Sequence, residues 1–331
     1  DLHRRRHSFP TRRSSDLNAQ GAGLFAVSAK ILLDPLKELP EQPLTFDIND
    51  ENLEIFIHFQ NGKYNFIGQK GDTYPQQKPL NDNAISISMD AQMLLNGISR
   101  SLFATADDEL RPVMNGVYFD IHTDDLTFVA SDGHKLVRLR NLAVKSPERA
   151  SFILPKKPAN LLKNLLAKES EQVLIKFDDN NAYITCTNFE MVCRLIEGRY
   201  PNYNSVIPQE NPFKVTIDRI SFLNALKRVS VFSNPASSLV KLHLKDSLIT
   251  VSAQDIDFST SAEERIVCQF DGTELSIGFK ATYLIEILGN ISSEEVVLEL
   301  ADPSRAGLIV PSENDEDEDL LMLLMPMMLN D

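Results

Sequence analysis

Three residues with the side chains used in hydrolytic chemistry stand within one short stretch. Ser131, Asp132 and His134 are the residue types of a nucleophile, an orienting acid and a general base. In a working triad these groups come from separate elements and converge on one substrate, which residues crowded into one turn cannot do. The spacing therefore argues against catalysis, and a hydrolase would have to lose activity when His134 is changed.

Other common site chemistry lacks its signature in the sequence. There is no GxxxxGK[ST] or GxGxxG phosphate loop. Cys186, Cys193 and Cys268 have no CxxC spacing and stand among strand-type residues, which favours buried reduced thiols and a reducing cytoplasm. The acidic run from Glu313 to Asp319 is typical of a solvated flexible loop and not of a metal cage. We expect no catalytic residue, no metal and no cofactor.

The turn at residues 131–134 ends a predicted β-hairpin. Apolar and polar residues alternate from Val117 to Ile121 and from Leu126 to Ser131, which predicts two half-buried strands joined by a turn at His122 to Asp125. Gly133 allows a positive φ at the end of the hairpin and aims the side chains that follow. The position of His134 therefore depends on how the hairpin packs.

A longer pattern repeats along the chain. A strand, a basic or small polar residue and a helix-period stretch occur three times, and Leu36, Leu162 and Leu288 within them recur at intervals of 126 residues. A second strand-and-helix pattern occurs only twice, beginning at Ser86 and Val215, with its helices offset by 128 residues. The period predicts a repeated unit with two helices, whose first copy lacks its first half.

Each unit is predicted to be α+β. Short alternating strands with Asp and Asn turns predict antiparallel sheet, and the apolar stripe of Leu94, Ile98 and Leu102 predicts a helix that covers one face of that sheet. The chain is thus a three-domain array of repeated units, each a sheet packed on two helices, with an incomplete first domain. The predicted domains are residues 18–83 (partial), 84–208 and 209–331.

The net charge is −14, and no apolar run approaches the length of a membrane span, so we expect a soluble protein. Residues 1–17 differ from the rest because they are basic, Ser-rich and without periodicity. A nucleic-acid arm or a transit peptide would also fit that description. We interpret the segment as extraneous, resembling adapter sequence fused to a truncated reading frame.

Two stretches contain no acidic residue in spite of the overall charge. Residues 149–168 and 219–245 each hold five lysines or arginines and each cover a predicted helix. Basic side chains repeated on helices of an acidic protein suggest one positive surface that faces phosphates, although one such helix alone could be basic by chance. No base-reading motif is present, so contact with DNA would be with the backbone and independent of sequence.

Three segments carry a resemblance to a known family. They are the stretch from Asp108 to Leu136, which includes an Asn-Gly strand and the turn Ser131-Asp-Gly-His-Lys-Leu136, the connector from Arg194 to Pro208, which includes Glu197-Gly-Arg-Tyr-Pro-Asn-Tyr203, and the tail Leu323-Leu-Met-Pro-Met-Met-Leu329. Together they resemble the bacterial sliding clamp, the β subunit of DNA polymerase III, over roughly residues 19–331. The first half of the family's first domain is absent.

The resemblance implies a non-catalytic processivity clamp. In the family the unit occurs three times per chain, and two chains close into a ring with helices around duplex DNA. The implied partners are a second copy, the polymerase III catalytic subunit, the clamp loader, repair polymerases and mismatch-repair proteins, in the cytoplasm and away from membranes. The alternative is a peptide-binding scaffold of the same fold that does not encircle DNA. The incomplete first domain puts ring closure in question, because domain one of one chain meets domain three of the other.

The resemblance also implies a groove for linear peptide motifs, built from the three segments. Methionine and leucine surfaces re-pack around different ligands, although a Met-rich tail is also typical of an ordinary core strand. Ser205 and Met328 stand where many members carry Arg, so the polarity of the groove differs. The groove residues would be Met114, Ser131, Gly133, His134, Lys135, Leu136, Pro201, Ser205, Val206, Leu323, Leu324, Met325, Pro326, Met327, Met328 and Leu329.

Candidates for DNA contact are chosen by charge and by position on the predicted helices, with one more in the loop before the Asn-Gly strand. These DNA-facing candidates are Arg100, Arg111, Lys156, Lys157, Lys163, Lys227 and Arg228.

Overall fold

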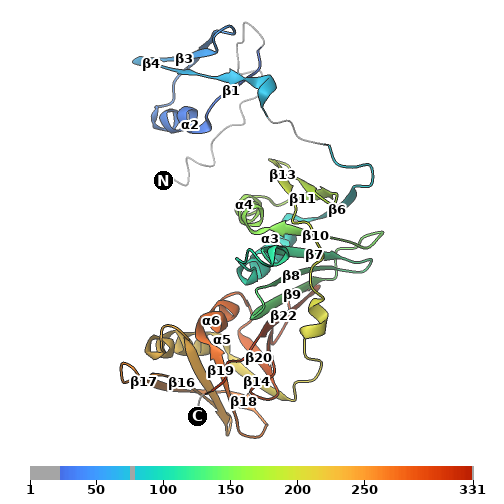
Figure 1. Cartoon of the computed structure of the whole chain (residues 1–331), viewed down its shortest axis with the longest axis vertical. Helices are drawn as coiled ribbons and strands as arrows, with labels where there is room; N and C mark the ends of the chain where they lie inside the picture. The colour runs from blue at the N-terminus through green and yellow to red at the C-terminus, as the bar shows by residue number, and fades with distance from the viewer. Residues whose placement is uncertain (1–22, 75–78, 330–331) are drawn as a thin grey trace. The chain divides into compact units, whose positions relative to one another are not determined.

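The computed structural model describes residues 23–74 and 79–329 and is shown in Figure 1. The chain divides into two compact units, the first up to residue 78 and the second from residue 79 onward. Residues 1–17, interpreted above as extraneous, lie outside the described residues. No helix in the described part of the chain is long and apolar enough to cross a membrane.

The first unit is a small sheet with one described helix. Its three-stranded sheet has the order β2-β3-β4, and Ile55 and Ile57 of the middle strand are buried. The helix α2 carries Leu36, the first of the three leucines with the 126-residue spacing. The elements of this unit are β1 (Phe25–Ala26), α2 (Ala29–Glu38), β2 (Thr45–Ile48), β3 (Glu54–Phe59), β4 (Gly62–Ile67), β5 (Gln69–Lys70) and the 3-10 turn η2 (Gly71–Thr73).

The second unit contains two successive copies of the predicted strand-and-helix repeat. Leu162 and Leu288 lie in α4 and α6, and the two copies of the second pattern form α3 and α5. The predicted repeat is therefore confirmed at the level of its helices. The helices are α3 (Ala91–Ser101), α4 (Lys156–Leu166), α5 (Arg219–Val229) and α6 (Ala281–Gly289), with 3-10 turns η3 (Leu102–Ala104), η4 (Pro112–Met114), η5 (Tyr203–Val206) and η6 (Ser230–Phe232).

The strands of this unit form three sheets. A nine-stranded sheet has the order β10-β7-β8-β9-β22-β21-β20-β14-β18, and four-stranded sheets have the orders β13-β12-β11-β6 and β17-β16-β15-β19. Every strand pairing is antiparallel, which confirms the predicted α+β class. The first repeat contributes β6 (Ile85–Asp90), β7 (Gly116–Ile121), β8 (Leu126–Ser131), β9 (Lys135–Asn141), β10 (Ala150–Pro155), β11 (Gln172–Phe177), β12 (Asn181–Thr185) and β13 (Glu190–Arg194). The second contributes β14 (Phe213–Asp218), β15 (Leu239–Lys245), β16 (Leu248–Asp255), β17 (Thr260–Val267), β18 (Gln269–Phe270), β19 (Leu275–Lys280), β20 (Glu295–Leu300), β21 (Gly307–Pro311) and β22 (Glu318–Leu324).

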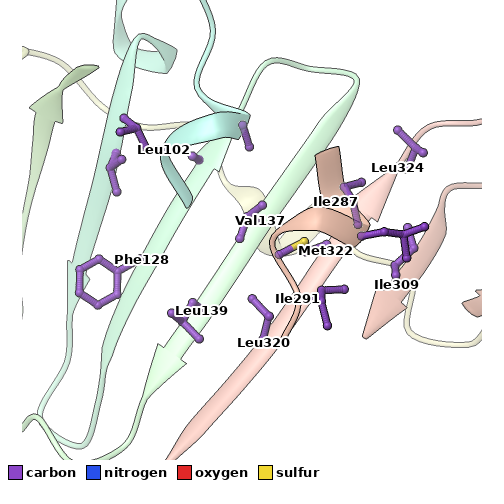
Figure 2. Packing of buried hydrophobic residues seen from close by; sticks show 14 of the residues in the cluster. Leu102, Phe128, Val137, Leu139, Ile287, Ile291, Ile309, Leu320, Met322 and Leu324 are labelled. Carbon is purple, nitrogen blue, oxygen red and sulfur yellow. The ribbon is translucent and has the colours of Figure 1, made fainter. Parts of the chain in front are cut away.

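The two repeats join where β9 pairs with β22. The register runs from Lys135 opposite Leu324 to Asn141 opposite Glu318. Figure 2 shows Val137 of β9 close to Met322 of β22 in a core that also includes α6. The nine-stranded sheet and its core therefore continue across the repeat boundary.

The two faces of the nine-stranded sheet are covered by different elements. On one face α3 packs on β8 and β9, α4 on β7 and β10, α5 on β14, and α6 on β22; Figure 1 shows these helices along one side of the sheet. Phe128 points into the core under the helices, whereas its neighbour Val129 packs with Tyr200 and Tyr203 on the other face. Alternation along the strands thus separates a helix-covered face from a face covered by residues 195–208 of the connector.

This double cover changes the burial expected for the hairpin. The prediction of a half-buried strand holds for β7, where Tyr118 and Asp120 are partly exposed. It is wrong for β8, in which every residue is buried. Central position in the sheet, with α3 on one face and the connector on the other, leaves β8 no solvent-facing side.

A matched pair of glycine substitutions tests the packing of α3. An added Cβ at Gly97 would lie 2.4 Å from the Phe128 ring, whereas one at Gly289 of α6 meets nothing within 4 Å. Gly97→Ala should therefore lower the free energy of unfolding by about 1–3 kcal/mol through overpacking. Gly289→Ala should be neutral or stabilising by up to about 1 kcal/mol, because alanine favours helix. Urea unfolding measures both, and equal stability of the two variants would contradict this packing.

Candidate nucleic-acid interface and partner surface

The turn between β8 and β9 is built by hydrogen bonds from its own polar side chains. Ser131 Oγ donates to the Lys135 carbonyl at 2.9 Å, and Asp132 Oδ1 accepts from the backbone N–H groups of His134 and Lys135 at 2.9 Å each. Gly133 has φ +91°, as predicted from its place after the hairpin. Within residues 79–329 no hydrogen bond joins the His134 ring to Ser131. The side chains of Ser131 and Asp132 therefore hold a turn together, to which His134 contributes its backbone N–H.

Lys135 ties this turn to the second repeat. Its Nζ lies 2.9 Å from Asp132 Oδ2, 3.1 Å from Glu286 Oε2 on α6, and 4.1 Å from the centroid of the Tyr283 ring. Burial opposes the charge, but these two carboxylates outweigh it and raise the pKa of Lys135. With a side chain only 6% exposed, Lys135 braces the repeat junction and does not face solvent.

The carboxyl-terminal tail passes directly beside the turn. Leu323 and Leu324 end β22 as buried residues. After them the Met325 N–H donates to the His134 carbonyl at 2.9 Å, and the Met327 N–H donates to the Gly278 carbonyl at 2.8 Å. Gly278 permits this approach, because an added Cβ would lie 2.7 Å from the Met327 carbonyl oxygen.

The connector packs against the same region on the face of the sheet opposite the helices. Tyr200 and Tyr203 pack with Leu136 and Leu323 in one apolar cluster, so the structure brings the three predicted groove segments together. Within them some predicted residues are buried, namely Met114, Ser131, Lys135, Leu136, Leu323 and Leu324. The others are exposed or partly exposed and are called the partner surface here: Gly133, His134, Pro201, Ser205, Val206, Met325, Pro326, Met327, Met328 and Leu329.

A hollow of about 460 Å³ lies beside His134 on the helix side of the junction. It spans both repeats, since Tyr283 comes from α6 and the other lining residues come from the first repeat. Its lining is mostly charged. The lining residues are Phe103, Thr105, Ala106, Asp107, Asp108, Arg111, Asp132, His134, Lys135, Lys156 and Tyr283.

Three of the DNA-facing candidates stand free on the helices. Among the described residues, Lys157 and Lys163 of α4 and Lys227 of α5 form no ion pair. Lys157 and Lys227 are exposed, and Lys163 is partly exposed. Both helices bury the opposite face, so these lysines point away from the sheet.

The other four candidates are held by carboxylates; the partner of Arg111 is three residues away in the sequence, and the partners of the other three are far away. Lys156 Nζ lies 2.5 Å from Asp107 Oδ2, Arg111 Nε lies 2.8 Å from Asp108 Oδ2, and Arg228 Nη2 lies 2.6 Å from Glu264 Oε2. Arg100 pairs with Glu318 at 2.9 Å and with Asp315, and its side chain is only 12% exposed. Arg100 therefore braces α3 against β22.

Part of the acidic run at residues 313–319 is bound by basic side chains. Asp315 and Glu318 hold Arg100, and Asp319 holds Arg138 at 2.8 Å. The expectation of a solvated loop agrees with the exposure of residues 313–317, and it is wrong for Glu318 and Asp319, which are partly buried in β22.

The cysteines are free thiols. Cys193 and Cys268 are buried and Cys186 is half-buried. Burial raises the pKa of Cys186 and of Cys193 to about 11, so both are protonated at neutral pH. Among the described residues there is no group of three or more His, Cys, Asp or Glu side chains that could hold a metal ion.

Two family models match consecutive parts of the chain. The central domain of the DNA polymerase III beta subunit matches residues 88–202, and the C-terminal domain of the same subunit matches residues 204–328. The chain belongs to the DNA polymerase III beta subunit family. The two matches fall on the two repeats that the shared sheet joins.

Known relatives agree with this membership. The beta sliding clamp of Pseudomonas aeruginosa is 27% identical over 313 residues, which cover 94% of this chain and 84% of the relative. That of Staphylococcus aureus is 26% identical over 309 residues, covering 92% and 81%. A crystal structure of the DNA polymerase sliding clamp from P. aeruginosa with ligand has a TM-score of 0.87 at 27% identity, covering 95% of this chain and 84% of that one.

Sequence reasoning missed several residues of this region. Tyr283 stacks near His134, with ring centroids 6.1 Å apart, and Lys280 Nζ lies 4.8 Å from the centroid of the Tyr283 ring. No sequence pattern around Lys280 or Tyr283 indicates that they lie near His134. Gly278 did carry a signal, because a glycine inside a strand pattern indicates close approach of another backbone.

The carboxylate of Asp132 gives the turn a predictable pH dependence. Burial opposes its ionisation, but hydrogen bonds from Lys135 and His134 outweigh burial and lower its pKa below the ordinary value of 3.8. A lowered folded-state pKa contributes stability that is complete above the ordinary value and lost as the pH falls through the folded value. Asp132→Asn should therefore cost about 1–3 kcal/mol at pH 7, because Lys135 stays buried without this partner, and progressively less as the pH falls below 3.8.

Urea unfolding across this pH range measures the difference from wild type. Asp124→Asn, in the exposed turn between β7 and β8, is the control and should have little effect at any pH. A destabilisation of Asp132→Asn that stays constant with pH would show that the carboxylate charge is not its cause.

Proposed function

We propose that this chain is a sliding clamp, a non-catalytic processivity subunit that encircles duplex DNA and tethers replication and repair enzymes to it. The observation that carries the proposal is the match of consecutive clamp domains to two repeats whose four helices cover one face of one continuous sheet. Such an arrangement turns the free lysines of α4 and α5 toward the same side.

Contact with DNA in this proposal is electrostatic and independent of sequence. Lys157, Lys163 and Lys227 have no carboxylate partner among the described residues, so they are available to phosphates. Backbone contacts of this kind carry no sequence information and weaken steeply with salt. These are properties that suit a part that moves along a duplex.

Ring closure in this proposal uses a second copy of the chain. β17 is the last strand of its sheet, and an unpaired strand edge is a ready template for pairing with another chain. Exposed apolar side chains lie nearby on η6 and in the turn before β17: Val231 is 77%, Ile256 81% and Phe258 75% exposed. In the family the third domain meets the first domain of the partner, and this surface supports such a contact.

Tethering is assigned to the partner surface. Val206 of the connector and Met325 and Met328 of the tail expose apolar side chains, with exposed fractions of 56%, 42% and 78%. Flexible methionines adapt to several ligands, which supports binding of linear motifs from the polymerase III catalytic subunit, the clamp loader, repair polymerases and mismatch-repair proteins. The free thiols are consistent with action in the cytoplasm.

Removing the free lysines tests the DNA-facing assignment. A Lys157→Ala, Lys163→Ala, Lys227→Ala variant should bind a labelled duplex more weakly, with a slope of log affinity against log salt lower by about 0.9 for each phosphate that is no longer neutralised. Fluorescence anisotropy between about 50 and 200 mM salt measures this slope. Lys176→Ala is the control, because Lys176 is exposed on β11 between the inward-facing Ile175 and Phe177. An unchanged slope in the triple variant would count against the assignment.

The mass of the particle separates the clamp from a scaffold of the same fold. Size-exclusion chromatography with light scattering at micromolar concentration should give a dimer for the clamp. Val231→Asp with Phe232→Asp should give a monomer, since charges in an apolar contact are left unpaired on association. A wild-type chain that is a strict monomer would favour the scaffold that does not encircle DNA.

A further inference from the structure

Two of the DNA-facing candidates, Lys156 and Arg111, form ion pairs with carboxylates of one loop. The loop between η3 and η4 carries Asp107 and Asp108 beside the first residue of α4. Lys156 Nζ lies 2.5 Å from Asp107 Oδ2, and Arg111 Nε lies 2.8 Å from Asp108 Oδ2. A phosphate that approaches either cation therefore meets a negative charge at the same place.

The loop is held in this position by its backbone. The Asp108 N–H donates to Asn115 Oδ1 at 3.0 Å, and Asn115 Nδ2 donates to the Asp108 carbonyl at 2.9 Å. The carbonyl of Asn115 in turn accepts from the Lys156 N–H at 3.1 Å. Asn115 thus fixes the acidic loop and the start of α4 to each other, and the carboxylates stay next to the cations even if a side chain swings away.

Both pairs are open to exchange with a ligand. The side chains of Asp107 and Lys156 are 81% and 35% exposed, and those of Asp108 and Arg111 are 28% and 52% exposed. Exposed ion pairs are weak because water screens them and ordering two long side chains costs entropy. A phosphate can therefore displace the carboxylate, which remains nearby and repels the phosphate.

The second repeat contains a similar arrangement. Arg228 near the end of α5 is held by both oxygens of Glu264 on β17, at 2.8 and 2.6 Å. Its side chain is 61% exposed. Carboxylates thus accompany exposed cations on both repeats, while Lys157, Lys163 and Lys227 form no ion pair among the described residues.

We propose that Asp107 and Asp108 are affinity-determining residues of the DNA-facing surface. Their carboxylates compete with phosphates for Lys156 and Arg111 and so lower the affinity for the duplex. The inference rests on the proposed clamp function. Binding exchanges a carboxylate for a phosphate at these two cations, so fewer counterions are released than the number of basic residues suggests. Lys157, Lys163 and Lys227, which form no ion pair among the described residues, attract the phosphates of the duplex without such competition.

The test is an Asp107→Asn, Asp108→Asn variant of the full chain, which removes two charges and keeps the side-chain shapes. Its affinity for a labelled duplex should rise about three- to tenfold at about 50 mM salt, and its salt slope should steepen by about one to two. Asp124→Asn with Asp179→Asn changes the net charge equally at exposed turns elsewhere, and should leave the slope unchanged.

A double-mutant cycle separates competition from a structural effect. Asp107 makes no hydrogen bond other than that to Lys156 among the described residues, so Asp107→Asn alone should fold normally and steepen the slope by about one. In a Lys156→Ala background the same change should have almost no effect. An equal gain with and without Lys156 would overturn the proposal.

The outcomes also distinguish this inference from the proposed function. If wild type binds the duplex in a salt-dependent way and the Asp107→Asn, Asp108→Asn slope is unchanged, the inference is wrong and the clamp remains. If neither protein binds the duplex at low salt, the assignment of the DNA-facing surface is wrong, and the inference fails with it.

Discussion

Hydrogen bonding between β9 and β22 is the constraint on which the rest of the second unit depends. Side chains in a strand alternate between faces, so a shift of one residue in this pairing would exchange the two faces of β22. With Leu323 opposite Leu136 and Met322 opposite Val137, each repeat presents the same face to its helices. The four helices consequently lie on one side of the sheet, and the lysines of α4 and α5 belong to one surface. The same pairing carries the chain end to His134, because the tail leaves β22 at Leu324, opposite Lys135.

Burial decides what each ion pair in this molecule does. Arg100 and Glu318 have side chains only 12% and 7% exposed, and burial raises the pKa of Glu318 in spite of Arg100, so desolvation outweighs their attraction. Such a pair would be costly to break, because either partner alone would be a buried charge, and it serves as a brace between the repeats. The pair of Lys156 with Asp107 has the same chemistry in a high dielectric, where forming and breaking it costs little. Burial therefore makes Arg100 a structural residue, whereas the more exposed Lys156 can exchange its carboxylate partner.

The parts of the structure that follow a local period were predictable from sequence, and the parts that depend on distant partners were not. The hairpin of β7 and β8, the helices of both repeats and the positive φ at Gly133 follow from alternation, helical spacing and the absence of a side chain. The burial of β8 on both faces could not be predicted, because the connector that covers its second face lies about 70 residues further along. Residues 149–168 contain no acid in sequence, yet Asp107 reaches Lys156 in space. The contact of Lys135 with Glu286 could not be predicted for the same reason, because Glu286 belongs to the next repeat.

In each of its three segments the partner surface begins close to a buried anchor. Lys135 is buried and His134 beside it is exposed; Tyr203 is buried and Val206 is exposed; Leu324 is buried and Met325 is exposed. Tyr203 is fixed further by a hydrogen bond from its hydroxyl to Asp120 at 2.8 Å. In the proposed function, adaptable side chains on a rigidly anchored backbone would let this surface fit several ligands without a large ordering cost in the chain itself. Because Lys135 also contacts Tyr283 and Glu286 of α6, a movement between the repeats would shift His134 relative to Tyr283. Rigidity of the repeat junction and the shape of the partner surface are therefore coupled through one buried lysine.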